Sequence, residues 1–466
     1  MYLSSWSFIA KVPDMNSPYL STEPVLTQAS QPEKTMASVG SRFSSIRQQT
    51  ENLIRPLSAE DCQLQSMPDA SPSKWHLAHL TWFFETFVLE RFEADFKPFD
   101  AGFRVLFNSY YNGVGEKHPR PQRGLISRPT LSNVLEYRSQ VNRRMQETMA
   151  QLAEHGSSSD QQKVLELVIL GLHHEQQHQE LLLTDIKHAL SFNPAQPAYV
   201  GRWPLTLTRP QPLAWLACGG GLVKHGFDTT LDGEFCFDNE APRHQVYVAP
   251  FEMASRPVTN GEMLAFTADR GYQRPELWLS MGWDWVQAGQ HSLPLYWRKA
   301  AGNNSGQYQN FTLHGLVDVD LNTPVCHLSY FEADAFARWS GARLPTEFEW
   351  ELAARCLPAA SQSNSNFVEH AAFHPLPQQG ESKGALAQMF GDVWEWTQSN
   401  YNPYPGYRPW EGLVGEYNGK FMCNQFVLRG GSCVTPKSHI RASYRNFFPP
   451  DARWQFSGLR LARDMR

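Results

Sequence analysis

Apolar side chains recur at intervals of three and four positions over residues 41–190, which is the spacing of one face of an α-helix. The pattern is strongest in three segments, 75–92, 131–152 and 164–190. A Pro- and Gly-rich stretch at 108–129 interrupts it, and a loop of that length inside a compact domain is usually functional. The economical interpretation is a four-helix bundle with one elaborate connection.

The character of the chain changes after a Pro-rich segment at 191–212, which lacks helical periodicity. Short alternating strands rich in Gly, Trp and Asn follow, and only two short helices are expected, at 260–269 and 330–340. A chain of 466 residues is too long for one ordinary core, so several domains are expected in an α+β protein. The predicted division is a disordered extension at 1–40, a helical bundle at 41–195, a linker at 196–212 and a second domain at 213–466.

Composition narrows the function classes. The formal charge of -5 is mildly acidic and lacks the excess of positive charge typical of nucleic-acid-binding proteins, so no nucleic-acid partner is expected. No apolar run reaches about 18 residues, so no membrane span is expected either. The seven cysteines are odd in number and form no C-x-x-C pair, which favours a cytoplasmic protein without a disulfide scaffold. No glycine-rich phosphate loop is present, so nucleotide cofactors have no support.

The sharpest local signal is the run from His173 to Glu180 inside the third helical segment. His174 and His178 are four residues apart, so a helix places both imidazoles on one face, with Cβ atoms roughly 5–6 Å apart. Glu175 between them completes the H-E-x-x-H pattern of zinc proteases, in which the Glu is the general base. A polar helix face with solvated histidines is the alternative interpretation.

A metal needs a third ligand, and another predicted helix carries His76 and His79. The apolar and aromatic residues that follow His79 suggest that its side chain points into the bundle, where facing helices build metal sites. Three neutral imidazoles leave coordination positions open, for water on zinc or for oxygen chemistry on iron(II), and the ligand set alone does not decide between them. His76, His173 and His188 are expected around the site or on the surface.

Longer motifs now give a family resemblance. Residues 75–79 together with His174 and His178 resemble the DinB-like bundle of ergothioneine sulfoxide synthases. Residues 341–351, 391–397, 429–432 and 457–462 resemble, in order, the motifs of the formylglycine-generating-enzyme domain, a C-type-lectin-like fold. The resemblance covers about residues 41–466. It implies a DinB-like four-helix bundle followed by a lectin-like domain that closes over it.

In that family the bundle holds iron(II), and the substrates are a thiol, dioxygen and hercynine, which is Nα-trimethylhistidine. The resemblance implies that His79, His174 and His178 bind the iron. Gln177 and Asn446 match positions that contact hercynine, and Phe447 stands where relatives often carry Trp. The implied reaction joins the thiol sulfur to C2 of the hercynine imidazole and oxidises the sulfur, which gives hercynylcysteine S-oxide. Aromatic faces such as Phe447 suit the quaternary ammonium of hercynine.

Two departures from the family pattern concern the thiol donor. Members that use γ-glutamylcysteine carry an Asp and an Arg where this chain has Phe448 and Ala452, so the charged contacts for that donor are absent. Asp451 and Arg453 lie nearby but out of register. The loop around Tyr110 and Tyr111 resembles the cysteine-using subgroup, so we expect Tyr111, with Tyr110 beside it, to supply the active-site phenol. Arg120 or Arg123 is expected to bind the cysteine carboxylate.

Several alternatives remain open at this stage: γ-glutamylcysteine as the donor, an ovothiol-type 5-histidylcysteine sulfoxide synthase, a DinB-type zinc thiol transferase, or a non-enzymatic lectin-like binding protein. Tyr401 and Tyr404 could line the pocket, and Cys433 is expected to be a buried structural thiol. The protein is expected to be a monomer or a weak homo-oligomer.

Overall fold

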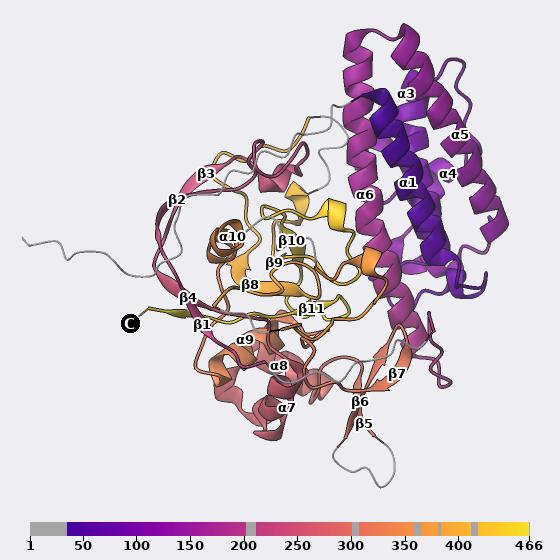
Figure 1. Cartoon of the computed structure of the whole chain (residues 1–466). Coiled ribbons are helices and arrows are strands. Elements are labelled where there is room, and N and C mark those ends of the chain that lie inside the picture. Colours follow the sequence, from indigo (N-terminus) through magenta and orange to yellow (C-terminus); the bar gives the residue numbers. More distant parts are fainter. Residues whose placement is uncertain are drawn as a thin grey trace, which may run out of the picture.

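The computed structural model describes residues 35–201, 211–300, 307–357, 365–380, 384–411 and 418–465. A bundle of long helices lies beside a β-rich part built from the second half of the chain (Figure 1). The predicted α+β architecture is therefore confirmed. Most of the predicted extension (1–34) and part of the predicted linker (202–210) lie outside the described residues.

Four helices form the bundle: α1 (Met36–Ile54), α2 (Ser73–Phe84), α5 (Leu131–His155) and α6 (Ser158–Ser191). The side chains of Thr35, Thr130 and Ser157 cap α1, α5 and α6 by accepting hydrogen bonds from backbone N–H groups of the first turn. Helix α1 begins before the predicted start of the bundle at residue 41. The predicted segment 75–92 is helical throughout, because α2 continues through a π-helical turn (Glu85–Leu89) into α3 (Glu90–Phe92).

The long connection between α3 and α5 contains α4 (Phe103–Leu106) and two 3₁₀ turns (Asn112–Val114 and Arg120–Leu125). Its predicted irregular part, residues 108–129, thus lacks a long helix or a strand. None of the helices in the described part of the chain is long and apolar enough to cross a membrane.

The described residues of the second domain contain four small sheets, with strand orders β1-β4-β12, β10-β9-β8-β11, β2-β3 and β5-β6-β7. The strands are β1 (Trp215–Cys218), β2 (Gly221–His225), β3 (His244–Val248), β4 (Phe251–Ala254), β5 (Trp297–Lys299), β6 (Tyr308–Thr312), β7 (Gly315–Asp318), β8 (Trp394–Asn400), β9 (Phe426–Arg429), β10 (Asn446–Phe448), β11 (Ser457–Gly458) and β12 (Ala462–Asp464). Among them, β10 carries Asn446, Phe447 and Phe448, which the sequence singled out as substrate contacts.

Four helices accompany these sheets within the described ranges of the second domain. The two predicted ones are confirmed as α7 (Asn260–Ala268) and α9 (Tyr330–Trp339). Two more, α8 (Ser280–Gly289) and α10 (Glu347–Arg355), were not predicted. Each is no more than ten residues long, so its helical periodicity extends over fewer than about three turns of 3.6 residues.

Helix α6 joins the two domains, since it is the bundle helix that lies against the second domain (Figure 1). The buried carboxylate of Glu180 accepts hydrogen bonds from Trp394 Nε1 and Thr435 Oγ1, both at 2.6 Å. One turn earlier, Gln176 donates to Ser438 Oγ at 2.6 Å. The helix that carries His174 and His178 is thus anchored directly to the second domain.

Candidate metal centre and substrate cavity

Three histidines from two bundle helices come together where α2 packs against α6. His79 lies on α2, and His174 and His178 lie one turn apart on α6. One ring nitrogen of each lies within 4.8 Å of a ring nitrogen of the other two. The residues are buried, with exposed fractions of only 1–6%. The structure therefore brings together the three side chains that the sequence singled out as metal ligands.

Hydrogen bonds on the far side of two rings determine which nitrogen is left for a metal. His79 Nδ1 lies 2.6 Å from the carbonyl oxygen of Phe107. A carbonyl oxygen only accepts, so Nδ1 carries the proton and Nε2 keeps its lone pair. His178 Nδ1 lies 2.7 Å from Nδ1 of His76, which likewise leaves Nε2 of His178 for a metal. Each ring is oriented by its outer hydrogen bond, as is usual for histidine ligands.

The electrostatic surroundings keep all three imidazoles neutral. Burial is the largest effect and lowers the pKa of His79, His174 and His178. For His174 the pKa falls to about 3, although the Glu175 carboxylate opposes the shift. Neutral imidazole is the form that coordinates metal ions. The donor set therefore fits a divalent transition metal, and iron and zinc both accept three imidazole nitrogens.

Glu175 faces away from the three histidines, into the core of the bundle. Its carboxylate accepts hydrogen bonds from Arg47 at 2.9 Å, Arg138 at 2.5 Å and Thr50 at 2.6 Å, and the residue is fully buried. Burial by itself raises the pKa of Glu175, but the adjacent guanidinium groups outweigh burial and lower the pKa to about 2. The zinc-protease role of a general base is therefore not available to this residue.

A cavity of about 550 Å³ lies between the bundle and the second domain and reaches His178. Its bundle side is formed by α2, by the long connection and by α6, and its other side includes β10 and the loops around it. Of the residues predicted from the sequence to bind metal or substrate or to supply the phenol, those that line the cavity are Tyr110, Arg120, Arg123, Gln177, His178, Asn446, Phe447 and Phe448. His79 and His174 join His178 in the three-histidine cluster and do not themselves line the cavity.

The two tyrosines of the long connection have different surroundings. Tyr110 lines the cavity, and its ring meets Phe421 of the second domain edge-on at 5.3 Å between ring centres. Tyr111 is buried, and its ring packs at 5.0–6.4 Å from Phe83, Phe87 and Trp82. Tyr111 is not among the residues that line the cavity. The sequence favoured Tyr111 as the active-site phenol, whereas the wall of this cavity contains Tyr110.

Arg123 is a buried cation on the bundle side of the cavity wall. Its guanidinium lies 3.4 Å from the ring centre of Trp75 and donates to Ser71 Oγ and Ser109 Oγ, both at 2.9 Å. Burial lowers the pKa of Arg123 to about 9. Trp75 stacks in turn on His79, at 4.6 Å between ring centres. Arg120, by comparison, donates to the carbonyl oxygen of Asp69 in a more exposed part of the wall.

Gln177 projects from α6 towards the second domain, where its amide nitrogen donates to Tyr444 OH at 2.8 Å. The opposite part of the wall is aromatic, since Phe447 stacks on Tyr401 at 4.0 Å and lies 5.9 Å from Phe421. Tyr401 supports Phe447 from behind and is not among the residues that line the cavity.

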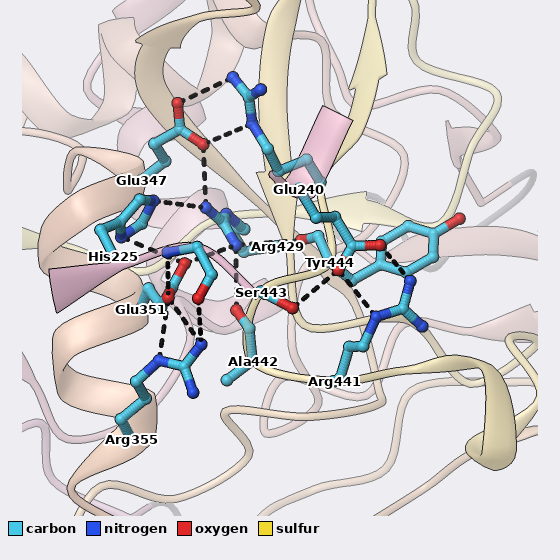
Figure 2. Close-up of polar contacts among 12 residues, drawn as sticks. His225, Glu240, Glu347, Glu351, Arg355, Arg429, Arg441, Ala442, Ser443 and Tyr444 are labelled. Carbon is cyan, nitrogen blue, oxygen red and sulfur yellow. Dashed lines mark hydrogen bonds and ion pairs between the residues drawn. The ribbon is translucent and has the colours of Figure 1, made fainter. Parts of the chain in front are cut away.

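A buried network fixes residues 441–446 next to the cavity, and Figure 2 shows its centre. Glu240 accepts hydrogen bonds from Arg441 Nε and Ser443 Oγ, both at 2.7 Å. Arg429 donates to the carbonyl oxygens of residues 442 and 444 at 3.0 and 3.1 Å. With the backbone and the side chains at 441 and 443 held in this way, residues 444–446 line the cavity.

The same network continues through Glu347, which pairs with Arg445 Nε at 2.8 Å and with Arg429 at 2.9 Å. The hydroxyl of Tyr404 reaches Glu347 at 3.2 Å, so Tyr404 belongs to the network and is not among the cavity-lining residues. Burial alone raises the pKa of Glu347, but Arg445 and Arg429 outweigh burial and lower it. Cys433 is completely buried, and burial raises its pKa well above the usual value, as suits a structural thiol.

Two further residues lie beside the cluster: His76, which was expected around the site or on the surface, and Asp185, which was not singled out from the sequence. His76 bonds to His178, and Asp185 bonds to His76, and both line the cavity. Their sequence signal is helical spacing alone: His76 precedes His79 by one turn, and Asp185 follows His178 by two turns.

Both the bundle and the second domain match families of known proteins. The family model of the DinB superfamily matches residues 42–182, and that of the "Sulfatase-modifying factor enzyme 1-like domain" matches residues 209–465. Two mycobacterial proteins named hercynine oxygenase are similar along nearly their whole length. That of Mycobacterium tuberculosis is 32% identical over 436 residues, which covers 88% of this chain and 96% of that protein.

The corresponding protein of Mycolicibacterium smegmatis is 32% identical over 445 residues, which covers 89% of this chain and 96% of that protein. A more distant relative is "Ergothioneine biosynthesis protein 1" of Schizosaccharomyces pombe, 27% identical over 239 residues. That match covers 49% of this chain and 28% of that protein.

Proposed function

Because the chain belongs to the hercynine oxygenase family and is an oxygen-using oxidoreductase, we propose that it joins cysteine to hercynine at an iron(II) centre. In this reaction the sulfur of cysteine attaches to C2 of the hercynine imidazole and takes up one oxygen atom. One dioxygen molecule accepts four electrons, two from forming the C–S bond and two from oxidising the sulfur. Its second oxygen leaves as water with the thiol proton and the C2 proton, and the product is hercynylcysteine S-oxide.

The observation that carries this proposal is a cluster of three buried, neutral imidazoles, one of which, His178, lines the cavity between the two domains. His79, His174 and His178 would hold the iron, which, when bound, supplies the redox chemistry with dioxygen and a binding position for a thiolate. Since no carboxylate joins the three histidines in the cluster of described residues, coordination positions remain for substrates. Holding both substrates in one cavity turns a multi-body encounter into one assembled geometry.

Gln177 and Asn446 support the assignment of hercynine as the acceptor. Both line the cavity from opposite domains, and both have amide groups that suit the imidazole and carboxylate of hercynine. The trimethylammonium group donates no hydrogen bond, so an aromatic wall is the favourable surface for it. Phe447 and Phe421 offer such a wall, and cation–π attraction there contributes about 0.5–2 kcal/mol.

The contacts around Phe448 favour cysteine as the thiol donor. Phe448 lines the cavity with an apolar ring, and Ala452 is buried with an exposed fraction of 1%. Arg453 is directed elsewhere, since its guanidinium donates to the carbonyl oxygen of Leu293 and reaches His291 at 2.9 Å. A γ-glutamyl extension therefore has no guanidinium from this segment to bind its carboxylate. Arg123, buried beside Trp75, is the cation that we assign to the carboxylate of cysteine itself.

We assign the active-site phenol to Tyr110, because it lines the cavity whereas Tyr111 packs in the bundle core. The Tyr110 hydroxyl would donate a proton to the oxygen that is reduced during the reaction. Lys420 of the second domain holds this tyrosine, since its ammonium donates to the Tyr110 carbonyl oxygen at 2.5 Å and lies 5.5 Å from the ring centre. Residues of the second domain thus help to hold this bundle-side tyrosine in place.

The test is a product assay with purified protein, iron(II), hercynine, dioxygen and either cysteine or γ-glutamylcysteine, followed by mass spectrometry. We expect hercynylcysteine S-oxide from cysteine, with much slower turnover of γ-glutamylcysteine. Faster turnover of γ-glutamylcysteine would refute the donor assignment alone. A complete lack of C–S bond formation with either donor, in protein that binds iron, would refute the proposed reaction.

A further inference from the structure

A chain of three buried side chains runs from the histidine cluster to a carboxylate. His178 Nδ1 lies 2.7 Å from His76 Nδ1, and His76 Nε2 lies 3.0 Å from Asp185 Oδ2. The exposed fractions of the three residues are 6%, 2% and 6%. His178 and Asp185 lie two turns apart on α6, and His76 on α2 spans the distance between them.

The positions of the protons in this series of hydrogen bonds can be assigned by starting from Asp185. An ionised carboxylate only accepts, so the bond to Asp185 places a hydrogen on Nε2 of His76. In a neutral His76 ring, Nδ1 then has no hydrogen and accepts. The donor in the bond between the two imidazoles is therefore His178 Nδ1, and the lone pair of His178 lies on Nε2. The chain thus selects one tautomer of His178, the tautomer that binds a metal through Nε2.

Asp185 is itself held in place from a third element of the structure. The backbone N–H of Ser71, just before α2, donates to the same Oδ2 atom at 2.8 Å. With two donors converging on one oxygen, the carboxylate has little freedom to turn away from His76. The orientation of the His178 ring is therefore set by the packing of α2 against α6.

His79 is held differently, and the difference distinguishes the two ligands. Its Nδ1 donates to a backbone carbonyl, which is neutral, whereas His178 donates through an imidazole to a carboxylate. A negative charge behind a histidine ligand makes the ring a stronger electron donor, and loss of such partners typically costs 10–100-fold in metal affinity or activity. His178 should accordingly be the more electron-rich of these two ligands.

We propose that Asp185 and His76 are positioning residues for the metal: they fix the tautomer of His178 and increase its donor strength. This inference rests on the metal centre of the proposed function, but not on the identity of its substrates. The two residues also line the cavity, so they connect the substrate chamber with the metal without coordinating it.

The experiment compares wild-type protein with Asp185→Asn, which keeps the shape and removes the charge, and His76→Phe, which removes both hydrogen bonds. His173→Phe is the matched control, because His173 is also buried, adjoins ligand His174 and bonds to His439 on the second domain instead. Cobalt(II) is the probe, and its dissociation constant is measured by competition with a chromophoric chelator, together with the visible absorption bands of the bound ion. Circular dichroism checks that each variant is folded.

We expect cobalt(II) affinity to fall about 10-fold in Asp185→Asn and up to about 100-fold in His76→Phe, with shifted absorption bands. His173→Phe should keep the wild-type affinity and spectrum. The midpoint potential of bound iron should rise in Asp185→Asn, because the lost negative charge had stabilised iron(III). Wild-type cobalt(II) affinity and spectra in both Asp185→Asn and His76→Phe would overturn the inference. An equal loss of cobalt(II) affinity in His173→Phe would also overturn it. Absence of sulfoxide formation by the wild type would refute only the proposed function.

Discussion

Replacing Glu175 by Gln tests whether this residue, which lies between the proposed metal ligands His174 and His178 in the sequence, has a structural or a catalytic role. The Glu175 carboxylate is fully buried and compensates the charges of Arg47 and Arg138. The variant leaves two buried guanidinium groups without their shared anion. Breaking a buried ion pair by removing one partner costs about 3–5 kcal/mol.

The pKa of Glu175 gives an independent magnitude. The difference between the ordinary value of 4.5 and about 2 corresponds to roughly 3 kcal/mol. Because the folded-state pKa is lowered, this stability is present above pH 4.5 and is lost as the pH falls towards 2. The difference in free energy of unfolding between wild type and Glu175→Gln should therefore be largest at pH 7 and should decrease below pH 4.5.

The assay is urea denaturation followed by circular dichroism at 222 nm, which reports mainly on the helical bundle, at pH 7 and at pH 4. The rate of sulfoxide formation per metal-loaded molecule is measured alongside. We expect a stability loss of about 3 kcal/mol at pH 7 and a rate within about 10-fold of wild type. A general base contributes 10²–10⁴-fold to a rate. A stable variant with a rate loss in that range would refute the structural assignment of Glu175.

Further predictions concern the cavity and the metal. Tyr110→Phe should lower the rate of sulfoxide formation by about 100-fold or more at unchanged iron content, whereas Tyr111→Phe should change it little; the reverse order in single-turnover kinetics would contradict our assignment of the phenol. Arg123→Met should raise KM for cysteine at least 10-fold and leave KM for hercynine nearly unchanged, and steady-state kinetics in each substrate decide this. Removal of the metal by a chelator should abolish turnover, and added iron(II) should restore it; turnover by metal-free protein would contradict the proposal.

The fold could be predicted from the sequence where periodicity is long. Helices α5 and α6 extend over 25 and 34 residues, so many turns repeat the same apolar face. Helix α10 was missed, although its capping box of Thr346 and Glu349 is present in the sequence. With nine residues, its hydrophobic face is too short to stand out from the neighbouring aromatic strands.

Most of the three-histidine cluster could be predicted, because helical geometry fixes the relation between two of its members. Two histidines four residues apart lie on the same face of one helix, and only the position of the third histidine, His79, depends on tertiary structure. The same geometry turns Glu175 by about 100° from His174, towards the core of the bundle. Helical geometry gives no such help in choosing between Tyr110 and Tyr111, since no helix or strand contains either residue. Lys420 and Phe421, about 310 positions further along the chain, determine where Tyr110 lies.

The most direct test of the account is the location of iron in the folded protein. Crystals loaded anaerobically with iron(II) should show one anomalous scattering peak at the iron absorption edge. We predict that the peak lies about 2 Å from one ring nitrogen each of His79, His174 and His178, with its remaining coordination positions open to the cavity. A fourth protein ligand that closes the site, or a peak away from these three rings, would contradict the account.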